Sequence, residues 1–186
     1  MPYTPPPELA SLSVAEIAKL AAAQKLPPVD QWDPQETGDS EMRIAADGTW
    51  YHQGDPIRRP AMVRAFSSIL RREADDSYAL VTPYQKLAIL VEDAPFVAVE
   101  LESEGSGNER TLAFRLNTDH LLVAGTDHPL RVGADRPQPY LQVRDGLEAV
   151  LARPVYYQLA ELALEEGADP VGIWSGGKFF PMASGS

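Results

Sequence analysis

The chain has 186 residues, of which 44% are hydrophobic and 23% charged; its net charge is −11 and it has no cysteine. This length suits one domain or two small ones with a packed core. The negative charge argues against binding of a nucleic-acid polymer, and the lack of cysteine excludes disulfides and zinc–thiolate sites. Since no apolar stretch reaches about 18–20 residues and no signal-peptide pattern begins the chain, we expect a cytoplasmic protein without a membrane span.

The first part of the chain predicts an α+β domain, which we place at residues 1–84. A helix is expected over residues 8–25, because apolar residues recur at helical spacing and Ser13 with Glu16 resembles a capping box. The stretch from there to Gly38 is polar and interrupted by prolines, which is typical of a linker. A hairpin around Asp47-Gly48 and a helix opened by Pro60 follow, with expected elements at 42–44, 49–52, 60–72 and 78–82.

The second part, residues 85–186, predicts a strand-rich domain that ends in a helix. Alternating apolar residues indicate strands near 86–92, 96–102, 109–116, 119–124, 129–132, 139–144 and 147–152, followed by a helix over 154–166 with Gly167 as its stop. The apolar faces of these elements predict a core that contains Trp50, Phe66, Leu80, Phe96, Leu147, Tyr157 and Trp174.

Two segments of the chain resemble each other and suggest an internal duplication. Residues 47–82 and 145–175 each contain an Asp-Gly turn, a strand, an Arg-Pro pair, a helix and a second strand, in the same order. Such self-similarity is sought before a fold is assigned. We therefore expect the two segments to superpose.

Two arginines are candidate anion-binding residues. Arg59 and Arg153 each precede a proline that opens a predicted helix, and helix N-termini attract anions through their unpaired N–H groups. Each arginine could instead pair with a nearby carboxylate such as Asp55 or Asp145, and this structural alternative is the favoured one.

Weaker signals follow two predicted strands, where a hydroxyl residue precedes a lysine. Lys86 follows Thr82, and Ser175 precedes Lys178 in a glycine-containing turn, but neither segment has the residue order of a Walker loop. The Asp-His pairs at His120 and His128 lack the tight spacing of metal ligands, so we expect neither a metal nor a cofactor.

Several motifs resemble those of a bacterial family called domain of unknown function 1285. They include the segments from Trp50 to Arg59, from Tyr78 to Pro83 and from Val91 to Phe96, and further pieces that contain Asn117–Asp119, His128–Arg131, Tyr140, Arg144 and Leu147–Ala149. The resemblance covers about residues 40–182. One departure is Gln85, where the family pattern has an acidic residue.

This resemblance implies a duplicated fold whose C-terminal domain is a pleckstrin-homology-like barrel capped by a helix. It also implies a nucleotide-like ligand between the domains and a role in signal transduction. His128, Tyr140 and Arg144 then join Arg59, Lys86, Arg153 and Ser175 as candidate ligand-binding residues. The first hypothesis is thus a non-catalytic small-molecule sensor. The second is a protein–protein adaptor, and the third is an enzyme for a phosphorylated substrate that uses His128 and Asp93.

Overall fold

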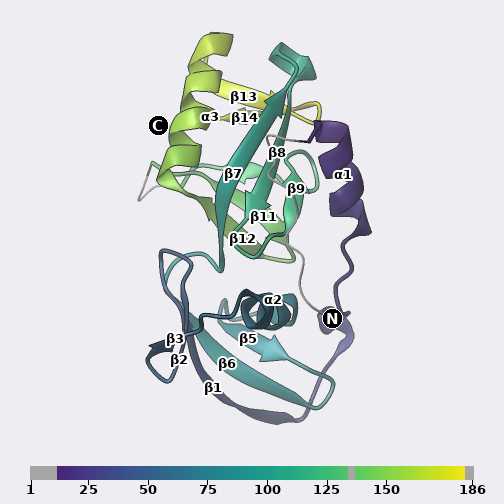
Figure 1. The fold of residues 1–186 in the computed structure, drawn as a ribbon, viewed down its shortest axis with the longest axis vertical. Helices are drawn as coiled ribbons and strands as arrows, with labels where there is room; N and C mark the ends of the chain where they lie inside the picture. Colours follow the sequence, from purple (N-terminus) through teal and green to yellow (C-terminus); the bar gives the residue numbers. More distant parts are fainter. Residues whose placement is uncertain (1–11, 134–136, 183–186) are drawn as a thin grey trace. The chain divides into compact units, whose positions relative to one another are not determined.

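The structure, a computed structural model, describes residues 12–133 and 137–182, which form two compact units. Unit 1 contains Lys25–Pro95 together with the short segment Asp145–Leu147. Unit 2 contains the described residues up to Gln24, those between Phe96 and Arg144, and those from Glu148 onward. Each unit is built around a curled six-stranded sheet (Figure 1).

Unit 1 combines one six-stranded sheet with a helix on one of its faces (Figure 1). Its elements in chain order are η2 (Val29–Gln31), β1 (Glu36–Ile44), β2 (Trp50–His52), β3 (Asp55–Pro56), α2 (Pro60–Ser68), β4 (Leu70–Arg72), β5 (Tyr78–Val81) and β6 (Gln85–Val91). The strand order is β3-β2-β1-β6-β5-β4, in which β1 and β6 are parallel and the other neighbours are antiparallel. The fully buried side chains of Trp50, Ile44 and Leu70 belong to its core.

Unit 2 contains a second six-stranded sheet, two helices and a small hairpin. Its elements are α1 (Val14–Ala23), β7 (Phe96–Glu104), η3 (Gly107–Glu109), β8 (Thr111–Leu116), β9 (Leu121–Val123), β10 (Leu130–Arg131), β11 (Tyr140–Arg144), β12 (Leu147–Leu151), α3 (Arg153–Glu166), β13 (Gly172–Ser175) and β14 (Lys178–Pro181). The strand order is β10-β11-β12-β7-β8-β9, with β12 and β7 parallel, while β13 and β14 pair only with each other.

The first helix of the chain packs against the sheet of unit 2. Val14 and Ile17 of α1 form a buried cluster with Ala113 of β8 and Leu121 of β9. The side chain of Gln24 fixes the end of this helix, because its amide nitrogen donates to the Leu121 carbonyl and its amide oxygen accepts from the Leu121 N–H. The expected division at residues 84 and 85 placed this helix with the first domain, whereas its apolar face is covered by β8 and β9.

The described residues therefore form a mixed α/β fold with two six-stranded sheets and a two-stranded hairpin, and most strands lie where the pattern of apolar residues predicts them. Three differences concern helix lengths and linkers. The helix expected over residues 8–25 spans Val14–Ala23, with the predicted capping box at Ser13 and Glu16, and residues 8–11 lie outside the described residues. The helix expected to reach residue 72 ends at Ser68, because Leu70–Arg72 pairs with β5 as a strand. Part of the expected linker is the start of β1, at Glu36.

The expected superposition of residues 47–82 with residues 145–175 is wrong. Tyr78–Val81 lies inside the sheet of unit 1 between β4 and β6, whereas Gly172–Ser175 pairs only with β14. The structure instead repeats a different set of elements. The six strands of unit 1 and the six strands of the unit 2 sheet follow the same order of connections, and in both sheets the first and sixth strands are the parallel pair at the centre.

The predicted core is mostly confirmed. Trp50, Leu80, Phe96 and Leu147 are buried, and Phe66 and Trp174 are partly buried. Tyr157 is the exception, with 56% of its surface exposed, because the buried face of α3 is formed by Val155, Leu159 and Ala163. None of the helices in the described part of the chain is long and apolar enough to span a membrane.

Candidate functional site

A groove of about 450 Å³ lies within unit 1, and it contains one of the residues singled out in the sequence, Lys86. The register of the sheet explains how it forms. Lys86 of β6 pairs with Thr37 of β1 on one side and with Val81 of β5 on the other, and two residues along, Ala88 pairs with Ala79. Because side chains alternate along a strand, Lys86 and Ala88 point to the same face of the sheet. The groove is lined by Thr37, Gly38, Glu73, Ala74, Asp75, Ser77, Tyr78, Ala79, Lys86 and Ala88.

A charged network at this groove is centred on Glu73. Its carboxylate accepts hydrogen bonds from Nε (3.2 Å) and Nη2 (3.0 Å) of Arg71, and its Oε1 lies 3.2 Å from Nζ of Lys86. Burial of the Glu73 carboxyl opposes ionisation, but the hydrogen bonds and charges of Arg71 and Lys86 outweigh it and lower the pKa of Glu73. The carboxyl is therefore ionised at neutral pH and holds both cations in place.

Arg71 serves as a structural residue in this network. Besides its two bonds to Glu73, its Nη1 donates to the carbonyl oxygens of Val29 and Trp32, both at 2.8 Å. These bonds tie the segment around η2 to β4, where Val29 also packs against Ala79 and Val81. A guanidinium has five N–H donors, and four of those of Arg71 are used inside unit 1.

Lys86 and Asp75 differ from Arg71, because each keeps hydrogen-bonding capacity that unit 1 does not use. An ammonium group has three donors, and Lys86 pairs with Glu73 alone within the described residues. The Oδ1 atom of Asp75 accepts from the backbone N–H and the hydroxyl of Ser77, which lower the pKa of Asp75 with a smaller contribution from Lys86. The second carboxylate oxygen of Asp75 has no partner in the described part of the protein. The groove thus offers an open donor and an open acceptor.

Ser175 belongs to unit 2 and is a buried structural residue. Its hydroxyl donates to the carbonyl of Ala124 at 2.7 Å and accepts from the N–H of Leu112 at 2.9 Å. Both bonds are to backbone groups, and the residue has no exposed surface.

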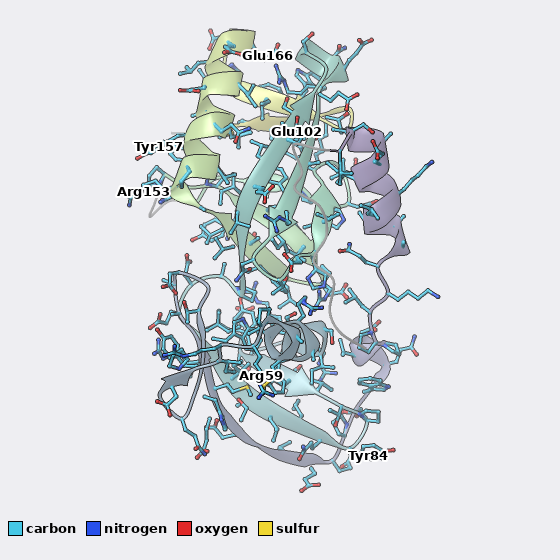
Figure 2. All side chains as sticks on the ribbon, in the orientation of Figure 1. Arg59, Tyr84, Glu102, Arg153, Tyr157 and Glu166 are labelled. Carbon is cyan, nitrogen blue, oxygen red and sulfur yellow. The ribbon has the colours of Figure 1, made fainter. Side chains whose placement is uncertain are left out.

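The other candidates fall into two groups. Arg59, in unit 1, is the N-cap residue of α2, and Arg153, in unit 2, begins α3; both are exposed (Figure 2). Since α2 joins the third and fourth strands of its sheet and α3 follows the sixth strand of the other, the two arginines do not occupy corresponding places. His128, Tyr140 and Arg144 lie in or beside β11 of unit 2.

Tyr140 and Arg144 are the first and last residues of β11, and Nδ1 of His128 lies 3.0 Å from the carbonyl oxygen of Gln142 on the same strand. The Tyr140 ring lies under the guanidinium of Arg131, 4.4 Å from its centroid, and Arg131 makes two hydrogen bonds to Glu148. The Arg144 guanidinium lies 5.5 Å from the centroid of the Phe96 ring. Whether these residues bind a ligand stays a prediction.

Comparison with protein families identifies the relatives of this chain. Residues 27–94 match the family model "Domain of unknown function (DUF1285), N-terminal domain", and residues 95–182 match "Protein of unknown function (DUF1285), C-terminal domain". The chain belongs to the DUF1285 family. The resemblance seen in the sequence motifs is thereby confirmed.

Two DUF1285 proteins of known structure are similar to this chain. The crystal structure of a DUF1285 family protein from Silicibacter pomeroyi DSS-3 is 47% identical, with a TM-score of 0.79 over 89% of this chain and 93% of that chain. A DUF1285 family protein from Shewanella baltica OS155 is 28% identical, with a TM-score of 0.53 over 64% of this chain and 90% of that chain. No curated protein matches the chain.

The groove of this DUF1285 protein contains two functional candidates that the sequence motifs did not indicate, Glu73 and Asp75. Both lie in or beside the turn between β4 and β5, in a charged stretch that resembles a solvated surface. The closest signal is the alternation of Arg71 with Glu73, which places two charged residues on one side of an extended segment. Asp75 follows in the turn, where side-chain direction is not set by alternation. Residues 12–133 and 137–182 contain no group of three or more side chains that could hold a metal ion.

Proposed function

We propose that this DUF1285 protein binds a small molecule non-covalently in the groove of unit 1 and acts as a sensor. The observation that carries the proposal is the groove itself, since about 450 Å³ falls within the range of about 300–1,000 Å³ typical of ligand sites. Lys86 supplies unused donors at its wall, and Ala79 and Ala88 supply an apolar floor. A few polar groups over an apolar surface are the usual composition of a binding site.

The nucleotide-like ligand, its place between the domains and the role in signal transduction remain proposals that rest on the family resemblance. Among the lining residues, Lys86 is the one cation, so a nucleotide in this groove would be held through a single phosphate group. Nucleotides are therefore among the compounds to be tested.

The test is a thermal-shift and NMR screen of the full chain with amino acids, nucleotides, dinucleotides and organic acids. A compound at 100 times its Kd stabilises the folded protein by about 2.7 kcal/mol. Its binding should shift the backbone amide signals of Thr37, Lys86 and Ala88, and Lys86→Gln should weaken it. Lys19→Gln is the matched control, because Lys19 is an exposed lysine of α1 in the other unit. If no compound moves these signals, the groove is not a ligand site and the proposal is wrong.

A second candidate function, a protein–protein adaptor, is supported by the exposed apolar side chains of α3. Tyr157 and Leu164 are 56% and 66% exposed, and residues seven apart share one face of a helix. Tyr157 projects from α3 on the side away from the sheet (Figure 2). A curled sheet followed by a long helix also supports our proposal that unit 2 is pleckstrin-homology-like, a class that commonly binds peptides at an edge or groove.

The adaptor hypothesis predicts that a partner binds to α3. A photo-crosslinking residue at position 157 should form a specific adduct in the source cell, and the pair Tyr157→Ser and Leu164→Ser should remove the partner without lowering stability. Recovery of the same partner by the double variant would contradict this function.

A further inference from the structure

The chemical groups that line the groove indicate which class of ligand it can bind. One of its walls carries Lys86, an ammonium group that keeps donors beyond its single ion pair with Glu73 at 3.2 Å. Glu73 remains bound by Arg71 through two hydrogen bonds, so a ligand can share the ammonium group without breaking the network. This wall is suited to one anionic group, such as a carboxylate.

Asp75, in contrast, is suited to a cationic group of the ligand. Its Oδ1 atom is used by Ser77, while its other oxygen is open, and its pKa is lowered by the hydrogen bonds of Ser77, so it is ionised at neutral pH. Lys86 and Asp75 both line the groove. An open carboxylate beside an open ammonium group is complementary to a ligand that carries both charges.

The apolar part of the groove lining is made of small side chains. Ala79 and Ala88 pair across β5 and β6, and Ala74 lines the same groove. Small side chains leave room for a large apolar group of the ligand, and contact with them would remove its surface from water. The groove volume of about 450 Å³ accommodates such a group.

From these three features we infer that the ligand is an α-amino acid with a large apolar side chain, recognised as a zwitterion by Lys86 and Asp75. This inference rests on the proposed function and specifies its ligand. A nucleotide is disfavoured, because its phosphates would meet one ammonium group with open donors and two carboxylates, Glu73 and Asp75. The repulsion from the carboxylates offsets the attraction of a single lysine.

The experiment uses compounds that differ in one charge at a time. L-phenylalanine carries both charges, N-acetyl-L-phenylalanine only the negative one, and L-phenylalaninamide only the positive one; AMP represents nucleotides. Titration calorimetry on the full chain gives each Kd, and NMR amide shifts of Thr37, Lys86 and Ala88 locate the site. We expect L-phenylalanine to bind about tenfold more tightly than either single-charge compound, the ratio that about 1.4 kcal/mol produces.

Two variants assign each charge of the ligand to its residue. In Lys86→Gln, L-phenylalanine and L-phenylalaninamide should bind equally well, because the partner of the carboxylate is gone. In Asp75→Asn, L-phenylalanine and the N-acetyl compound should bind equally well. Since both comparisons are made within one variant, a general loss of stability does not produce them, and Lys19→Gln should keep both tenfold ratios.

The outcomes separate this inference from the function on which it rests. If AMP binds more tightly than L-phenylalanine, or if the single-charge compounds bind as tightly as the zwitterion, the ligand class is wrong but the groove remains a binding site. The same conclusion follows if L-phenylalanine leaves the groove signals unchanged while another compound of the screen shifts them. If nothing shifts them, both proposals are wrong.

Discussion

Replacing Ser175 with alanine should destabilise unit 2, because this buried hydroxyl hydrogen-bonds two backbone groups of different segments. The side chain is fully buried at the end of β13. It accepts a hydrogen bond from the N–H of Leu112, in β8, and donates one to the carbonyl of Ala124, which follows β9. The hydroxyl therefore holds the β13–β14 hairpin against the large sheet.

The expected loss is about 2–4 kcal/mol. Leaving a buried donor or acceptor without a partner costs about 1–3 kcal/mol, and the substitution removes the partner of one donor and one acceptor. The adjacent Gly176 also lies close to Ala124, since a Cβ added to Gly176 would be 3.0 Å from the Ala124 carbonyl oxygen. For a chain of this length about 2–4 °C of melting temperature accompanies each kcal/mol, so the Tm should fall by about 5–15 °C.

Chemical denaturation followed by tryptophan fluorescence measures this change, because Trp174 directly precedes Ser175. Ser68→Ala is the matched control: that hydroxyl donates to the Ala65 carbonyl within the exposed turn of α2, and its loss should cost under about 0.5 kcal/mol. A loss below about 0.5 kcal/mol for Ser175→Ala as well would refute the structural role. Ser175 would then return to the list of ligand-binding candidates.

Three further predictions concern other parts of the chain. The pKa of Glu73 is lowered in the folded protein, so its contribution to stability should be complete above the ordinary value of 4.5 and disappear as the pH falls through the folded value. The denaturant midpoints of the wild type and Glu73→Gln should therefore differ at pH 7, and the difference should shrink as the pH is lowered below 4.5. Ser13→Ala removes the cap of α1 and should cost about 1 kcal/mol, whereas Ser13→Asp should keep most of the stability; equal midpoints for the wild type and the alanine variant would contradict this. Gly172→Ala would place a Cβ 2.6 Å from the Phe180 carbonyl oxygen and should reduce stability by about 1–3 kcal/mol in the same assay; an unchanged midpoint would contradict the close pairing of β13 with β14.

The sequence predicts the strands of this protein well, and it fails where pairing between distant segments decides the structure. β11 alternates between buried and partly buried positions, and β7, β8 and β12 each contain a run of three buried residues. Both apolar patterns are typical of strands and can be recognised without a fold. Leu70 continues the apolar pattern of α2 and was therefore assigned to that helix, but it pairs with Leu80 in the sheet. Glu36 and its neighbours at the start of β1 are exposed and polar, and only the pairing with β6 makes them a strand.

In the candidate site, too, neighbouring residues reveal some members, while others are brought in only by the pairing of distant segments. Lys86 was a candidate because it follows a strand and a hydroxyl residue, which is a local pattern. Glu73 and Asp75 were not, because they become part of the groove only when the β4–β5 turn is placed beside β6. The prediction of a buried Tyr157 is wrong for a local reason: Val155, Leu159 and Ala163 form the buried face of α3, and Tyr157 lies on another face of that helix.

The internal repeat lies in the two sheets and not in the helices, which is why residues 47–82 and 145–175 do not correspond. In each sheet the first three strands form a meander whose first strand is central, and the last three form a meander whose last strand is central. Leu70–Arg72 in unit 1 and Leu130–Arg131 in unit 2 hold the same place, the outer strand of the second meander, and each pairs a leucine with a leucine of the next strand. The helices differ, because α2 precedes that outer strand while α3 follows the whole sheet. A sheet must keep its register to bury one face, whereas a helix in a connection can be gained or moved. The repeat is therefore seen in the strand order, and the two Arg-Pro pairs before the helices are not part of it.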